Sequence, residues 1–93
     1  MIRSFKDKRT EALIHGEVPR GIDARIVKRV QRVLMALDEV SKPTDLWKVP
    51  GYRAEKLGGD RAGQWSLRVN DQWRICYRWT DEGPEDVELT DYH

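Results

Sequence analysis

Cysteine is almost missing from this chain, since Cys76 is the only one among 93 residues. A single thiol excludes an internal disulfide. The two histidines, His15 and His93, lie far apart in the sequence. Together with one cysteine they provide too few ligands for a structural zinc site, so we expect no bound metal and no cofactor.

Long apolar runs are also missing. No segment approaches the roughly 20 consecutive apolar residues that a membrane-spanning helix requires. The first eight residues carry charges where a signal peptide has its apolar core, which argues against export. Internal repeats, linkers and low-complexity stretches are absent as well. We therefore expect one soluble, cytoplasmic domain over residues 1–93, which is too short for a second core.

Basic residues are missing from the end of the chain. Residues 81–93 contain six acidic side chains and no Lys or Arg, whereas all 17 basic residues and the other 10 acidic ones precede them. The net charge of +1 therefore conceals a basic body and an acidic tail. A basic surface suits a nucleic acid or an acidic partner, although charge that is merely solvated explains the same composition.

Hydrophobic periodicity predicts helices in the first half of the chain. Alternation over 2–5 is consistent with a short opening strand, and 10–15 reads as a short helix. Apolar residues at three- and four-residue steps predict an amphipathic helix over roughly 23–40, with Asp23 as its N-cap. The prolines at 43 and 50 end helical structure.

The second half of the chain has the pattern of β-strands. The predicted strands cover residues 52–57, 64–69, 73–79 and 86–92. Short turns separate the last three, which implies an antiparallel meander. The fold class is therefore α+β, with a twisted, mainly antiparallel sheet, helices on one face and the other face open.

Arginines and tryptophans alternate along the central hairpin. Because successive side chains on a strand point to opposite faces, Trp65, Trp73 and Trp79 are assigned to packing. The other face then presents its cations together, namely Arg68, Arg74 and Arg78. Such a cluster requires either paired Asp and Glu residues or a bound polyanion, and both interpretations remain open. Trp47 lies in an irregular segment and is expected to be exposed.

The last three residues combine groups that suit acid–base chemistry. His93 is a candidate general acid or base, Tyr92 a second proton donor, and Asp91 a group that orients a neighbour. The alternative for such a terminal segment is fraying.

Four segments carry a resemblance to a known family. They are Arg53–Leu57, Gly59–Ser66, Asn70–Cys76 and Asp91–His93. With them the chain, over nearly its full length, resembles the HigB-type toxins of the RelE/ParE superfamily. The resemblance implies a RelE-like microbial-RNase fold and ribosome-dependent cleavage of mRNA. It also implies neutralisation by a HigA-like antitoxin that carries a helix-turn-helix DNA-binding domain, so that contact with DNA is indirect.

The resemblance also implies roles for particular residues. Arg74 is expected to contact the scissile phosphate, and Asp91, Tyr92 and His93 to complete the active site. Two positions depart from the family pattern, because some members have a histidine where Glu55 stands and a lysine where Gly58 stands. Glu55 is a candidate replacement for the histidine. Candidates for the missing positive charge are Lys56 and Arg53.

The implied reaction is attack of a ribose 2′-hydroxyl on the adjacent phosphate, without a metal. It requires a base, cations for the developing negative charge and an acid for the leaving oxygen. The candidate bases are Glu55 and Asp91, and the candidate acid is His93. Cations that contact RNA are expected among Arg53, Lys56, Arg61, Arg68, Arg74 and Arg78.

Two other functions fit the same features. A toxin of this fold can poison DNA gyrase by protein contact, as ParE relatives do, without hydrolysing RNA. The chain can also be a non-catalytic module that binds RNA or an antitoxin. Its binding would then weaken as the salt concentration rises, and it would cleave no RNA.

Overall fold

The computed structural model describes residues 1–91, so the predicted tail residues Tyr92 and His93 lie outside the described part. Two helices precede four strands, with two short 3₁₀ turns between α2 and β1 and a third between β1 and β2. The elements are α1 (Lys8–Ile14), α2 (Ala24–Glu39), η1 (Pro43–Leu46), η2 (Pro50–Tyr52), β1 (Glu55–Lys56), η3 (Gly59–Arg61), β2 (Gln64–Arg68), β3 (Trp73–Thr80) and β4 (Gly83–Asp91). Neither helix of the described residues is long and apolar enough to cross a membrane.

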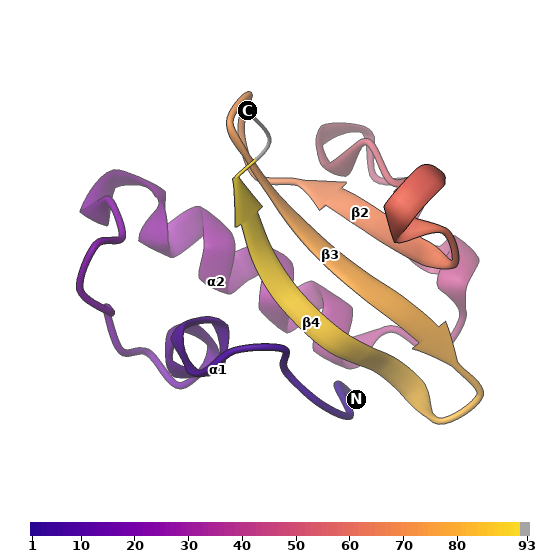
Figure 1. The fold of residues 1–93 in the computed structure, drawn as a ribbon, viewed down its shortest axis with the longest axis horizontal. Helices are drawn as coiled ribbons and strands as arrows, with labels where there is room; N and C mark the ends of the chain where they lie inside the picture. Colours follow the sequence, from indigo (N-terminus) through magenta and orange to yellow (C-terminus); the bar gives the residue numbers. More distant parts are fainter. Residues whose placement is uncertain (92–93) are drawn as a thin grey trace.

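The four strands form one antiparallel sheet in the order β1-β2-β3-β4. Figure 1 shows α2 behind this sheet and α1 beside the β4 edge. Because each strand pairs with its neighbour in sequence, the strands need only short connections. The predicted α+β architecture and the antiparallel meander are confirmed.

Helix α2 follows its sequence pattern closely. The Asp23 side chain accepts a hydrogen bond of 2.8 Å from the Arg25 backbone N–H and so caps the first turn. The apolar residues that recur at three- and four-residue steps are buried, whereas Met35 is exposed; the buried ones are Ile26, Val27, Val30, Val33, Leu34, Leu37 and the C-cap residue Val40. They pack against the sheet face that carries Leu67, Ile75 and Leu89. One face of the sheet is therefore buried in the hydrophobic core.

The predicted opening strand over 2–5 does not form a regular strand. Phe5 makes a single parallel bridge to Val87 beside β4. The Asp86 backbone has a left-handed φ of 53°, and its N–H donates to Ser4 Oγ at 2.9 Å. A backbone N–H used in this way is lost to the ladder. Backbone hydrogen bonds join residues 3–6 to Pro84 and Val87 on either side of Asp86, so the pairing is interrupted there and no regular strand forms.

The predicted strand over 52–57 shortens to the two residues of β1. Pro50 starts η2, and Arg53 then adopts a left-handed φ of 41°. Both conformations are incompatible with an extended strand. The strand therefore begins only at Glu55.

Helix α1 completes the outer edge of β4. The Leu89 backbone N–H donates to the hydroxyl of Thr10 at 3.0 Å, and the Leu89 carbonyl accepts from Arg9 at 3.0 Å. Thr10 is fully buried. Two side chains of α1 thus satisfy the backbone of Leu89 at the outer edge of β4.

Thr10→Val is predicted to destabilise the fold by about 1–3 kcal/mol, because it leaves the buried Leu89 N–H without an acceptor while preserving side-chain volume. Thr10→Ser, which keeps the hydroxyl, is the control. Urea unfolding followed by circular dichroism measures both. Equal stability of Thr10→Val and the parent protein would contradict this account.

Candidate active site

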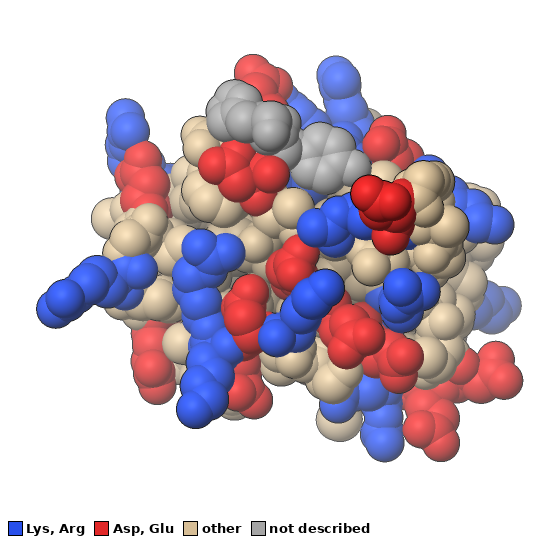
Figure 2. Space-filling model, viewed as in Figure 1, with Lys and Arg blue, Asp and Glu red and all other residues tan. Residues whose placement is uncertain are grey.

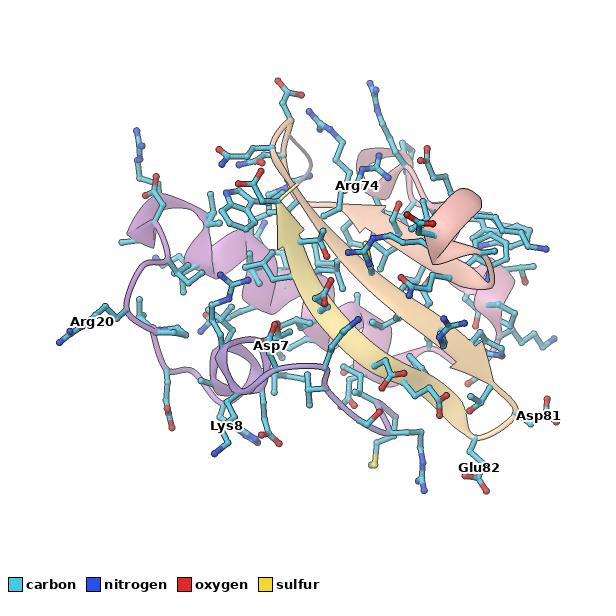
Figure 3. All side chains as sticks on the ribbon, in the orientation of Figure 1. Asp7, Lys8, Arg20, Arg74, Asp81 and Glu82 are labelled. Carbon is cyan, nitrogen blue, oxygen red and sulfur yellow. The ribbon has the colours of Figure 1, made fainter. Side chains whose placement is uncertain are left out.

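The sheet face turned away from α2 carries polar side chains that the register aligns across all four strands. Glu55 pairs with Ser66, Ser66 with Cys76, and Cys76 with Glu88. The next row contains Arg68, Arg74 and Thr90. We call these seven residues the polar sheet face. Arg74 is labelled on it in Figure 3.

Arg74 is held against the middle of this face. Its Nη1 donates a hydrogen bond to the Ser66 hydroxyl and lies 3.8 Å from Glu55 Oε1. Its side chain is only 13% exposed, whereas that of Glu55 is 55% exposed. An ion pair with so exposed a carboxylate contributes little to stability. The structure therefore brings the predicted phosphate-binding cation and one predicted base together.

Arg61 reaches the same face from η3, the red-orange turn in front of β2 in Figure 1. Its Nη1 donates to Gln64 Oε1 at 3.0 Å, and its Nη2 donates to Glu88 Oε1 at 3.0 Å. Gln64 belongs to β2 and Glu88 to β4. The Arg61 guanidinium therefore spans the sheet from one strand to the other.

Side chains cover the middle of the face that the sequence predicted to be open. Ser66 and Cys76 are both buried. Burial raises the pKa of the Cys76 thiol, although a hydrogen bond with Thr90 and the charges of Arg61 and Arg74 act in the opposite direction. Cys76 is thus a free, packed thiol. Within residues 1–91 there is no group of three or more His, Cys, Asp or Glu side chains that could hold a metal ion.

Acidic side chains compensate the arginines within the chain. Arg68 lies directly opposite Arg74 in the register, an arrangement of like charges that is destabilising by itself. Arg68 forms an ion pair with Asp71, while Glu55 and Glu88 lie beside Arg74 and Arg61. Figure 2 shows basic and acidic side chains intermingled over this side of the molecule. Acidic partners therefore accompany the arginines of this face, as in the salt-bridged interpretation that the sequence left open.

Strand alternation separates Lys56 from the predicted site. Lys56 pairs with Trp65, and its ammonium lies 5.9 Å from the centre of the Trp65 ring. Since adjacent residues of a strand point to opposite faces, Glu55 joins the polar sheet face and Lys56 does not. Arg53 is exposed in the loop before β1.

Two other predicted residues lie at the ends of the strands. Arg78 shares the face of Arg74 through its pairing with Gln64, and its Nη1 donates to the Ala62 carbonyl at 3.5 Å. Asp91 pairs with Trp73, which places it on the opposite face from Arg74 by register. Its carboxylate accepts a hydrogen bond of 3.1 Å from Gln72. The catalytic roles of Asp91, Tyr92 and His93 remain predictions.

The tryptophans behave as the alternation predicts. Trp65, Trp73 and Trp79 are partly buried against the core. Trp47 is 45% exposed, and its ring centre lies 4.7 Å from that of Trp65.

The functional candidate that the sequence analysis missed is Glu88. Its position opposite Cys76 depends on a shift in the register of β3 and β4 between Cys76 and Arg78, which the local sequence pattern does not indicate.

Comparison with known proteins decides the family. A family model described as the RelE-like toxin of the type II toxin-antitoxin system HigB matches residues 3–93. The chain belongs to this family. The protein named Endoribonuclease HigB, from Proteus vulgaris, is 33% identical over 93 residues, which is the full length of both chains. Toxin HigB-1 of Vibrio cholerae is 37% identical over 82 residues, covering 87% of this chain and 86% of that protein. The family resemblance expected from the sequence is thus confirmed.

Solved structures confirm the fold of this HigB-family chain. The YoeB-YefM complex from Staphylococcus aureus matches with a TM-score of 0.62 at 19% identity, covering 100% of this chain and 98% of that one. YafQ from Escherichia coli strain BL21(DE3) matches with a TM-score of 0.59 at 16% identity, covering 98% and 91%. At such identities the likeness concerns the fold, and it agrees with the RelE-like architecture expected.

Cys76 is predicted to react slowly with a thiol reagent such as dithionitrobenzoate at pH 8. Burial both blocks access and raises the pKa of the thiol, so labelling of the folded protein should be at least about a hundredfold slower than in 8 M urea. Absorbance at 412 nm measures the rate. Comparable rates in the two conditions would show that the face around Cys76 is open.

Proposed function

We propose that this HigB-family chain is the toxin of a type II toxin-antitoxin system and acts as an endoribonuclease on mRNA. The observation that carries the proposal is similarity over the full length to a protein named Endoribonuclease HigB. The polar sheet face adds a chemical reason, because it places guanidinium groups and a carboxylate within a few ångströms of one another. Phosphodiester cleavage needs those groups.

The proposed reaction is metal-independent transfer of the phosphoryl group to the neighbouring ribose oxygen. The 2′-hydroxyl attacks phosphorus, the bond from phosphorus to the 5′-oxygen breaks, and the products are a 2′,3′-cyclic phosphate and a 5′-hydroxyl. Glu55 takes the proton of the 2′-hydroxyl. His93 returns a proton to the leaving 5′-oxygen, and Tyr92 stacks on a base or donates a proton.

Arg74 stabilises the negative charge that develops on the phosphate. Charge-assisted hydrogen bonds from a guanidinium are stronger than neutral ones, and its planar fork matches two phosphate oxygens. The 3.8 Å pair between Arg74 and Glu55 leaves the carboxylate beside the phosphate position, where a base is needed. Arg61 and Arg68 add positive charge, and Arg78 and Arg53 extend the contact along the RNA backbone.

The proposal includes partners. Membership of a toxin-antitoxin family implies that an antitoxin binds this chain. We further propose that it is HigA-like with a helix-turn-helix domain, so that contact with DNA is indirect, and that the toxin cleaves mRNA on translating ribosomes in the cytoplasm.

Arg74→Ala is predicted to reduce mRNA cleavage by about 10²–10³-fold, because it removes a cation from the charge that develops at phosphorus. Arg74→Lys should recover only part of the rate, since an ammonium lacks the planar fork. Cleavage in a reconstituted translation system, with sequencing of new 5′ RNA ends, measures both. Arg20→Ala is the matched control, because Arg20 projects from the left edge of the molecule in Figure 3, away from Arg74.

The same assay separates the alternatives. Intact mRNA together with DNA damage in growing cells would indicate a gyrase poison. Salt-dependent RNA binding without new 5′ ends would indicate a non-catalytic module. Either result would overturn the endoribonuclease proposal.

His93→Ala and deletion of His93 are each predicted to abolish most cleavage, because the leaving 5′-oxygen then lacks its acid. General acid catalysis is typically worth about 10²–10⁴-fold. Single-turnover cleavage on programmed ribosomes measures the loss. If both variants keep the full rate, the acid is another group.

A further inference from the structure

We propose that Glu88 is a positioning residue that holds Arg61 across the polar sheet face beside Arg74, so that the two guanidinium groups form one phosphate-binding site. The inference rests on the proposed function and deepens it, because it names the residue that preorganises the second cation. The family resemblance assigned no role to Glu88.

The contacts of Glu88 converge on one oxygen. Oε1 accepts from Arg61 Nη2 at 3.0 Å and from the Thr90 hydroxyl at 2.8 Å. The Glu88 side chain is 16% exposed and that of Arg61 33% exposed. A partly buried, hydrogen-bonded ion pair is screened less than a surface pair, so it constrains the guanidinium more strongly. The second oxygen, Oε2, lies 3.8 Å from Lys6 Nζ.

Arg61 is held from two strands at once. Gln64 on β2 accepts from Nη1, and Glu88 on β4 accepts from Nη2. Two contacts on different nitrogens of a planar group fix its orientation as well as its position. A long arginine side chain otherwise has considerable rotamer freedom that RNA binding would have to restrict.

The strand register places the contact between Arg61 and Glu88 next to the contact between Arg74 and Ser66. Ser66, which accepts from Arg74, and Glu88, which accepts from Arg61, are both paired with Cys76. Three strands span roughly 10 Å at the usual interstrand spacing, a distance into which both guanidinium groups reach. The charges of Arg61, Arg74 and Glu88 all act on the Cys76 thiol, which agrees with this proximity.

Two adjacent guanidinium groups repel each other when no anion lies between them. Glu88 offsets this repulsion at Arg61 and leaves Arg61 in place for a phosphate. The site is then preorganised before RNA arrives, which is the condition under which electrostatic stabilisation of a transition state is most effective.

The test compares Glu88→Ala with Glu88→Gln. In Glu88→Gln the amide oxygen takes the place of Oε1 and still accepts from Arg61 and Thr90, but the charge that offsets the repulsion is lost, so cleavage should fall less than in Glu88→Ala. Glu88→Ala removes the contact of Arg61 with β4 and should lower kcat/KM by about 10–100-fold, the range found for residues that orient metal ligands. Faster cleavage by Glu88→Ala would overturn the proposal, because Glu88 would then be an inhibitory counter-ion.

A double-mutant cycle shows whether Glu88 acts through Arg61. In the Arg61→Ala background, Glu88→Ala should cost nothing further, whereas independent roles would give additive losses and overturn the proposal. Thr90→Val provides a second cycle if Glu88→Ala unfolds. It removes one of the hydrogen bonds to Glu88 and should lower cleavage several-fold only when Arg61 is present.

A titration with inorganic phosphate tests the site without any cleavage. The side-chain Nε–H resonances of Arg61 and Arg74 should shift together in the parent protein and in Glu88→Gln, and Arg61 should stop responding in Glu88→Ala. Separate responses in the parent protein would overturn the inference even if mRNA is cleaved. A joint response without mRNA cleavage would instead overturn the proposed function and leave the inference standing.

Discussion

Charge compensation on one face of a four-stranded sheet is the constraint on which the rest of this structure depends. Arg68 and Arg74 lie opposite each other in the register, and Arg61 lies over the neighbouring row. Like charges at such positions oppose folding unless acids offset them. Glu55 and Glu88 do so from opposite edges of the sheet, with the pairs at 3.8 Å and 3.0 Å.

The other face of the sheet supports this arrangement. Helix α2 packs its apolar side there, and α1 satisfies the edge of β4 through Thr10. A sheet held in this way keeps its strands in register, and the register in turn decides which side chains meet on the polar face. The stability of the core and the geometry of the site are therefore coupled through the strands themselves.

The two acidic partners have different consequences for function. Glu55 is exposed and its pair with Arg74 is long, so a phosphate can take its place at the guanidinium while the carboxylate stays near. Glu88 is mostly buried and makes shorter contacts, so it remains with Arg61. These differences agree with the proposed roles, in which Glu55 transfers a proton and Glu88 holds a cation. This division suits a family with a member named for endoribonuclease activity.

Local pattern was enough to predict α2 with its Asp23 cap, the central hairpin and the packing of Trp65, Trp73 and Trp79, because these features depend on neighbours in sequence and on periodicity. Pairing between distant segments decided the rest. The left-handed backbone at Arg53 shortened β1, and alternation from there sent Glu55 to the polar face and Lys56 away from it. Likewise, the register of β4, with its shift opposite Cys76 to Arg78, brought Glu88 to Arg61. A one-residue change in pairing reverses the face of every side chain, and only the assembled sheet determines that pairing.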